Sequence, residues 1–364
     1  MLILPRLARI LNMLPMSLTD TAYYTRRAIN WGILGVIAYI VLRIFWSIFI
    51  AVFIMFFPPK AIPPNHAFGK LPAIKFPAAA PDPAKLVFQL QTIEGDVPKA
   101  SESANVYFMP KKAPNLLALN NAQEFAGQLE FNPTPIQESK NIYRFNDQEF
   151  PLRRLRYDIV SSNFIVRYAF EQDPSVFLER SFPAPDTIKQ EAINMLTTYD
   201  LYNDDLSSGS PEVTYWKLNG TTLVPVGSLS QADAVRIDFF RTPIGGMKIF
   251  TASPGEAPVS LIFSGASHRK KRLLQLAYTH WPIDIQTFAS YGLKTSAQAW
   301  QELQSGMGYI ARYPTGGDTA VIRNVYLGYY DSYEVQTYLQ PVFVFEGDNG
   351  FMAYVPAIAA PWTE

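Results

Sequence analysis

The sequence of 364 residues contains no cysteine. Without thiols the chain can form no disulfide bond, no thiolate nucleophile and no zinc–thiolate site. A domain of this chain outside the cell must therefore be held together by an ordinary hydrophobic core. The roughly 280 residues that follow position 83 are enough for such a core, in one large domain or in two smaller ones.

Histidine is scarce as well, and none of His66, His268 and His280 belongs to a catalytic or metal-binding motif. The sequence has no HExxH zinc motif and no GxSxG elbow, and Asp204 and Asp205 lack the alternating acids of a calcium loop. We interpret His280, in YTHWPID, as a strand-end histidine that bonds to the backbone. The sequence therefore predicts a protein that is not an enzyme and that needs no cofactor and no metal.

Charge is also low, at 17% of the residues against roughly 25% in an average soluble protein. Five Arg and one acid precede residue 58, so residues 58–364 hold 26 basic and 30 acidic residues. The one basic run, at 269–272, is interpreted as a turn in solvent, with contact to acidic wall polymers or lipid headgroups as the alternative. This mildly acidic balance argues against nucleic acid as a partner.

What the sequence does contain is one long apolar run, at 31–57, with a single charge among 27 residues. A bilayer core needs about 20 apolar residues in a helix, so the run predicts one transmembrane helix. It exceeds the roughly 7–15 apolar residues of a signal peptide, which favours an uncleaved anchor.

Arginines on the N-terminal side of this run set the expected orientation. Arg6, Arg9, Arg26 and Arg27 precede it, and the positive-inside rule then places residues 1–30 in the cytoplasm. We expect the C-terminal domain to lie outside the cell membrane. The first residues, which mix Leu and Ile with Arg, lie either along the inner membrane surface or in a disordered tail.

Arg43 lies near the middle of the predicted span. A charge there costs roughly 2.5–3.5 kcal/mol and marks a functional candidate. Either the side chain is tolerated and reaches the interface, or it pairs with a polar group on the transmembrane helix of a partner. Tyr39 and Ser47 lie four residues to either side, on the same helix face. These three residues form the predicted partner-binding site, and the bilayer and a membrane protein are the predicted partners.

The region after the span begins with eight prolines within 58–83, which predict a semi-rigid polyproline spacer. Further on, apolar residues alternate with polar ones at 154–159 and 164–171 and predict a hairpin with one buried face. The same alternation appears at 235–239. A second hairpin is predicted around the turn Gly347-Asp348-Asn349-Gly350.

Three helices are predicted between these strands, at about 119–130, 187–202 and 296–305. They begin with capping signatures at Asn120, Thr187 and Thr295, and Gly306 ends the last of them. Helices that alternate with runs of adjacent strands predict an α+β fold, with antiparallel sheets and helices packed on one face. We divide the outer region into subdomains at 84–185 and 186–364.

The C-terminal part, about 295–358, resembles the closing module of the YycH/YycI family of membrane-anchored regulators of a bacterial sensor histidine kinase. The matching features are a helix that ends in Gly, a strand that ends in Gly-Tyr and a Leu-x-Pro strand with an aromatic residue. These positions are Gly306, Gly328, Tyr329, Leu339, Pro341 and Phe343. The whole chain also resembles uncharacterised single-pass proteins of candidate-phyla bacteria.

The resemblance implies a regulator that acts on a kinase through its transmembrane helix, a role that suits Arg43. The alternative is a structural or assembly component of a cell-envelope complex, such as a pilus or a secretion machine. A third interpretation is an enzyme whose site follows no known motif.

Overall fold

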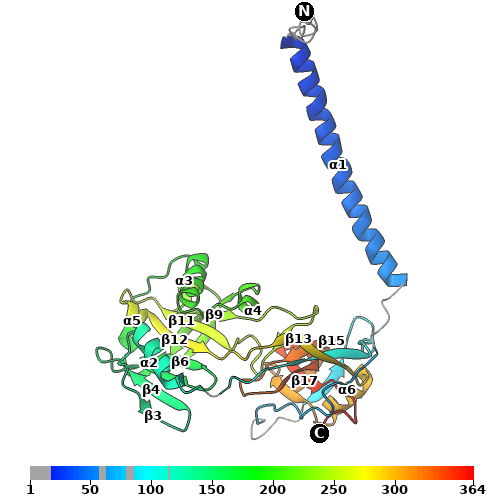
Figure 1. The fold of residues 1–364 in the computed structure, drawn as a ribbon. Helices are drawn as coiled ribbons and strands as arrows, with labels where there is room; N and C mark the ends of the chain where they lie inside the picture. Colours follow the sequence, from blue (N-terminus) through cyan, green and yellow to red (C-terminus); the bar gives the residue numbers. More distant parts are fainter. Residues whose placement is uncertain (1–17, 57–62, 79–85, 114) are drawn as a thin grey trace, which may run out of the picture. The chain divides into compact units, whose positions relative to one another are not determined.

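The computed structural model describes residues 18–56, 63–78, 86–113 and 115–364 (Figure 1). The chain divides into two compact units, Met1–Ala61 and Ile62–Glu364. Each unit is described by itself below.

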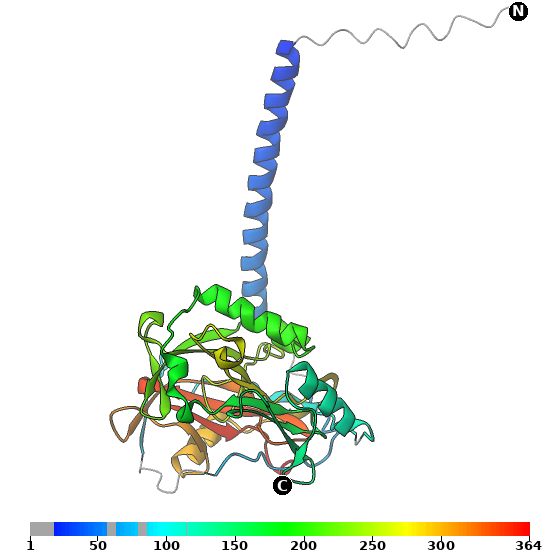
Figure 2. The same cartoon turned by 90° about the vertical axis from the view of Figure 1, so that its left-hand side faces the viewer.

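The described residues of the first unit form one helix, α1 (Leu18–Phe56), which runs unbroken for 39 residues, about 58 Å (Figure 2). Its segment Ile29–Ile50 is long and apolar enough to cross a membrane, with a mean hydropathy of 2.4. All side chains from 31 to 50 are exposed within the chain. The predicted span is thus confirmed in position. The helix also extends back to Leu18, so residues 18–30 are helical. The first residues, for which a surface helix or a disordered tail was expected, lie outside the described residues.

The larger part of the second unit is a nine-stranded antiparallel sheet with the strand order β3-β4-β5-β6-β12-β11-β9-β7-β8. The bounds of its strands are β3 (Ile136–Gln137), β4 (Ile142–Asn146), β5 (Arg153–Asp158), β6 (Phe164–Tyr168), β7 (Glu212–Asn219), β8 (Thr222–Val226), β9 (Ala234–Phe239), β11 (Val259–Ser264) and β12 (Leu273–Tyr278).

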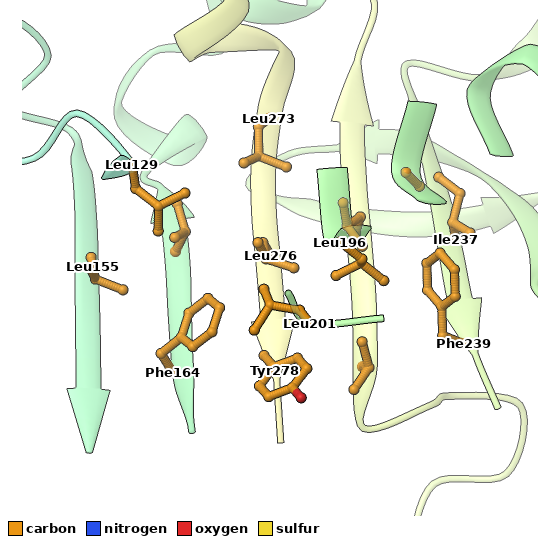
Figure 3. Close-up of a cluster of buried hydrophobic side chains, with 14 of the residues drawn as sticks. Leu129, Leu155, Phe164, Leu196, Leu201, Ile237, Phe239, Leu273, Leu276 and Tyr278 are labelled. Atoms are coloured by element: carbon orange, nitrogen blue, oxygen red, sulfur yellow. The ribbon is translucent and has the colours of Figure 1, made fainter. Parts of the chain in front are cut away.

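Two helices, α2 (Ala118–Gln128) and α3 (Pro185–Thr198), cover one face of this sheet. Side chains such as Leu155, Phe164 and Leu276 point from the strands toward Leu196 of α3 (Figure 3). The buried cluster spans six strands and both helices, and it confirms the prediction of helices packed on one face of an antiparallel sheet.

Short helical segments connect the strands of this sheet, and two of them, η1 and η2, cover part of its other face. They are η1 (Phe170–Gln172), η2 (Pro174–Phe177), α4 (Asp204–Ser207), η3 (Leu229–Gln231) and α5 (Arg269–Arg272). Val176 and Phe177 of η2 pack there against Tyr168 and Leu274. Central strands are therefore covered on both faces.

Strand β9 shows what this double cover does to a pattern of alternating residues. Every residue from Ala234 to Phe239 is buried, including Arg236 and Asp238. The two side chains lie on one face and form an ion pair, with Arg236 Nε 2.8 Å from an Asp238 carboxylate oxygen. The predicted strand is confirmed. Its apolar and charged residues point to opposite faces of the sheet, but both faces are buried at this strand, so the charged face is not in solvent.

The second sheet has eight strands and draws on both ends of the unit. Its strands are β1 (Val87–Leu90), β2 (Ser103–Phe108), β10 (Ile249–Phe250), β13 (Asp284–Gly292), β14 (Tyr309–Arg312), β15 (Thr319–Tyr330), β16 (Tyr338–Gly347) and β17 (Met352–Pro356). Most pairs are antiparallel, but β1 and β10 each pair with β15 in parallel. Helix α6 (Ser296–Gln304) packs on this sheet through Ala299 and Leu303.

The two predicted hairpins are confirmed. Strand β5 pairs with β6, with Leu155 opposite Val166, and β16 pairs with β17 around the turn η4 (Asp348–Gly350). In that turn Asn349 and Gly350 both have positive φ, 56° and 75°, which these residue types adopt readily.

The helix caps are confirmed in one case of three. Thr295 and Gln298 form the predicted capping box of α6, and Gly306 follows its end with φ of 81°. Helix α3 begins instead at Pro185, a residue preorganised for the first helical position, so Thr187 lies inside it. Helix α2 begins at Ala118, three residues after an asparagine turn at Asn115.

Residues 63–78 contradict the prediction of a free proline-rich spacer. Leu71 is fully buried and forms a β-bridge with Thr363, and His66 stacks on Trp362 with ring centroids 3.9 Å apart. Phe76 stacks in the same way on Tyr309, at 4.9 Å. This segment is part of the folded unit because its apolar residues complete the core around the second sheet. Residues 58–62 and 79–83 of the predicted spacer lie outside the described residues.

The predicted boundary between 185 and 186 is wrong as well. Strands β6 and β12 come from opposite sides of that position and pair with each other, with Phe164 opposite Tyr278. The division that exists is between two sheets within one compact unit, and the second sheet combines strands from before and after the first.

Candidate functional site

The three residues predicted as a transmembrane partner site share one face of α1. Arg43 and Tyr39 are exposed, and the Ser47 hydroxyl donates a hydrogen bond to the carbonyl oxygen of Ile44, at 2.8 Å. Arg43 forms no ion pair with any of the residues that the structure describes. An opposite charge for this guanidinium therefore has to come from outside the described part of the chain.

A second group of charged residues, not predicted from the sequence, lies in the folded unit where the two sheets meet. Arg241 follows β9 of the first sheet and Asp331 follows β15 of the second. Arg241 Nε lies 2.9 Å from Asp331 Oδ2, and its Nη1 lies 3.1 Å from Asp205 Oδ2. Its Nη2 donates to the carbonyl oxygen of Trp281 at 2.6 Å. One guanidinium thus joins both sheets and α4.

His280, just after β12, completes this charged network. Its Nε2 lies 3.0 and 3.1 Å from the two carboxylate oxygens of Asp205. Its Nδ1 faces the side-chain nitrogen of Asn203 at 3.4 Å, and the same amide donates to the Tyr278 hydroxyl at 2.8 Å. The expectation that His280 bonds only to backbone is wrong, because a helix distant in sequence brings a carboxylate to its ring.

The two carboxylates of the network have opposite pKa shifts. Burial raises the pKa of Asp331, and it outweighs the favourable charge of Arg241. Burial also raises the pKa of Asp205, but the hydrogen bond from His280 and the charges of His280 and Arg241 reverse the effect and leave it lowered. Asp205, which is one-third exposed, is therefore ionised at neutral pH.

A hollow of about 890 Å³ opens beside the network, and Asp205, Arg241 and His280 line part of its wall. A second hollow, of about 430 Å³, lies against Arg241 and is lined by Phe250 and Met352 as well. Within the described ranges, no group of three or more His, Asp or Glu side chains is placed to hold a metal ion. The arrangement is suited to hydrogen bonding and ion pairing with a bound molecule.

The basic run 269–272 forms the single helical turn α5, and the expectation of a solvated loop is wrong. All four of its cations pair with acids. The pairs are Arg269 with Glu130, Lys270 with Asp147 at 3.2 Å and Glu149 at 3.1 Å, Lys271 with Asp173 at 3.1 Å, and Arg272 with Glu191 at 2.7 Å. These charges are used to connect α2, α3 and the strand loops, so the turn is not an open surface for anions.

The two serines that precede the basic turn, and Asp204, have structural roles. The hydroxyl of Ser264 is fully buried and donates to the carbonyl oxygen of Lys271 at 2.9 Å. Ser267 donates its backbone N–H to Glu179 at 2.7 Å. Asp204 opens the four-residue helix α4, which positions its neighbour Asp205 toward His280.

Sequence reasoning missed Arg241 and did not connect Asp205, His280 and Asp331. Asp205 and His280 are 75 residues apart, and no fixed spacing relates them. The signal that was present is positional, since Arg241, His280 and Asp331 each follow the end of a buried strand by one or two residues.

Comparisons with known proteins add little to these observations. No family model and no curated protein match the chain. Nine chains of solved structures match it. One is an uncharacterized protein from Eubacterium rectale ATCC 33656, which is 12% identical with a TM-score of 0.39 and covers 71% of this chain and 84% of its own. A likeness of this size decides neither the fold nor the function of the chain.

Proposed function

We propose that this protein is a non-catalytic regulator, anchored in the cell membrane by one helix, with residues 1–30 in the cytoplasm and the folded unit outside. In this proposal the helix transmits the regulation by binding the transmembrane helix of a sensor histidine kinase. The observation that carries the proposal is the exposed charge of Arg43 within the span.

The position of Arg43 makes a passive role costly. It lies seven residues from Ile50, the nearer end of the span, which is about 10 Å at 1.5 Å per residue. An arginine this deep costs roughly 2.5–3.5 kcal/mol on insertion scales, and a polar or acidic group on a second helix relieves that cost. Tyr39 and Ser47 add hydroxyl groups to the same face, which suits a polar contact between helices.

The geometry of the charged network supports the non-catalytic part of the proposal. A general base needs a ring nitrogen that is open to the substrate proton. The Nε2 of His280 is taken by Asp205, and its Nδ1 faces the amide of Asn203. A histidine held on both sides in this way orients its neighbours rather than transferring protons.

Site-specific crosslinking in native membranes tests the proposal. A photoreactive residue is placed at Tyr39 or Ser47, and as a matched control at Val41 or Phe45 on the opposite helix face. We expect crosslinks to one membrane protein from the first pair only, and their loss in Arg43→Leu but not in Arg43→Lys. Crosslinks of equal yield from both faces, or unchanged crosslinks in Arg43→Leu, would contradict a role for this face.

Mass spectrometry of the crosslinked product then separates the two functions left open by the sequence. A sensor kinase supports the regulator, whereas a pilus or secretion component supports an envelope-assembly role. The orientation is tested separately with a reporter fused after Glu364, which should be active only outside the cytoplasm.

A further inference from the structure

The hollow beside the charged network continues into two smaller ones, because neighbouring hollows share wall residues. The hollow of about 890 Å³ shares four wall residues with a neighbouring hollow of about 420 Å³, namely Asp200, Asn203, His280 and Pro282. The hollow of about 420 Å³ in turn shares Lys112, Tyr157 and Ser162 with a hollow of about 310 Å³. The three form one groove, which passes the ends of β5, β6 and β12. The first hollow alone approaches the upper limit of a small-molecule pocket, so the groove is suited to an extended chain.

A row of stacked rings lines the middle of the groove. Tyr157 stacks on Phe164 at 5.9 Å, Phe164 on Tyr278 at 5.4 Å, and Tyr278 on His280 at 5.9 Å. Phe164 and Tyr278 lie side by side at the ends of their strands (Figure 3). Their ring faces are covered by one another, so they present edges and hydroxyl groups to the groove. A sugar ring stacks on an open aromatic face, and the two middle rings of this row, Phe164 and Tyr278, offer none.

The charges along the groove are separated by sign. Asp200 and Asp204 are exposed in the largest hollow, and neither forms an ion pair among the residues that the structure describes. Lys112 is exposed where the two smaller hollows meet, and it too forms no ion pair with a described residue. The carboxylate of Asp205, in contrast, is already paired with Arg241 and His280.

Part of the wall of the largest hollow is apolar. Ile244, Ile249, Ile283 and Ile285 line the same hollow as Asp200. A lysine or arginine side chain fits such a site, because its aliphatic part packs on apolar surface while its charged end reaches a carboxylate. A neutral sugar gains little from isoleucine side chains. The combination therefore favours a peptide over a glycan.

We propose that this groove binds an extended peptide segment, with a Lys or Arg side chain in the largest hollow and an acidic group toward Lys112. Asn203, Ser162 and the tyrosine hydroxyls offer hydrogen bonds to the peptide backbone between these two ends. The peptide site goes beyond the function proposed above and does not depend on Arg43. Either proposal can fail without the other.

Fluorescence anisotropy of the full-length protein in lipid nanodiscs tests the site. The probes are fluorescein-labelled hexapeptide pools, each with Lys, Arg or norleucine fixed at one position and the others randomised. We expect the Lys and Arg pools to bind roughly fivefold more tightly than the norleucine pool, the factor that about 1 kcal/mol of ion pairing gives. Equal binding of all three pools would overturn the proposal.

The variant Asp200→Asn locates the binding. Asp200 has a φ of 56°, which asparagine also tolerates, so the backbone should be retained. We expect it to reduce the preference for Lys and Arg over norleucine at least twofold, with Asp204 still present, whereas Asp186→Asn, the same change at an exposed acid on α3, should leave the preference unchanged. An equal effect of both variants would refute the groove as the site. Binding of fluorescein-labelled chitohexaose that is lost in Asp200→Asn would replace the peptide with a glycan.

Discussion

Replacing Arg241 with methionine should destabilise the folded unit strongly, because one guanidinium holds both sheets. The substitution removes three contacts, of 2.6, 2.9 and 3.1 Å, and leaves Asp331 without its partner. The Asp331 side chain is only 2% exposed, and its second oxygen already has no hydrogen-bond partner among the described residues. Breaking one side of a buried pair costs about 3–5 kcal/mol, and we expect a loss in this range.

The pH dependence of that loss follows from the carboxyl group left behind. An acid whose pKa is raised on folding stabilises the protein below its unfolded pKa, and this contribution is lost as the pH rises through its folded value. Arg241 limits the rise of the Asp331 pKa. Without it the pKa rises further, so the penalty of Arg241→Met should be larger at pH 8 than at pH 5.

Urea unfolding of the full-length protein in detergent micelles measures these effects, with tryptophan fluorescence and near-ultraviolet circular dichroism as two probes of one transition. The double variant Arg241→Met/Asp331→Asn removes both charges and should recover at least half of the loss. A single-variant loss below about 1 kcal/mol, or strict additivity of Arg241→Met and Asp331→Asn, would refute a coupled buried pair.

Three further outcomes are expected. A fragment of residues 63–364 should fold without metal or reductant and show more strand than helix by circular dichroism, and 84–364 should be less stable by roughly 2–4 kcal/mol because the packing of the first segment is lost. Hydrogen bonds from a serine, a tyrosine and a lysine lower the pKa of Asp173 to about 2. The ionised carboxylate therefore stabilises the fold above about pH 4, and this contribution is lost as the pH falls through about 2. Urea titrations should show that Asp173→Asn costs roughly 1 kcal/mol of unfolding free energy at pH 7 and progressively less toward pH 2. Gly265→Ala should lower the melting temperature, because its Cβ would lie 2.5 Å from a backbone oxygen, whereas Gly127→Ala, in open space on α2, should raise it.

Local sequence patterns predicted the local structure well where burial of one face determined which residues alternate. Alternation around Leu155 and Val166 led to a correct hairpin, because one face of those strands is buried and the other is not. Alternation around Arg236 suggests an exposed polar face, but the arginine is buried. A sequence pattern shows that a strand has two faces, and it does not show what covers each of them. Thr187 failed as a cap because Pro185, two residues earlier, was the stronger start signal.

The charged network was out of reach for a different reason. Its members are brought together by the pairing of β12 with β6 and by the meeting of two sheets, and neither arrangement can be derived from residue spacing. Asp205 was considered only as part of a calcium loop, and Asp331 and Arg241 each appeared as one more charged residue after a strand. Long-range pairing also explains why 63–78 was mistaken for a spacer, since its contacts are with Tyr291, Tyr309 and Trp362.

The interleaved order of the two sheets has a consequence for biogenesis. The nine-stranded sheet uses residues 136–278, so it can be completed as soon as that stretch has been made. Strand β1 must wait for Thr319 in β15, and Leu71 waits for Thr363. The segment that follows α1 is thus the first part of this unit to be made and the last to find its partners, which lengthens the time for which unpaired strand edges are exposed. A nascent chain arrested between about residues 278 and 320 would carry a finished first sheet and an unfinished second one, and quality-control proteases would meet it in that state.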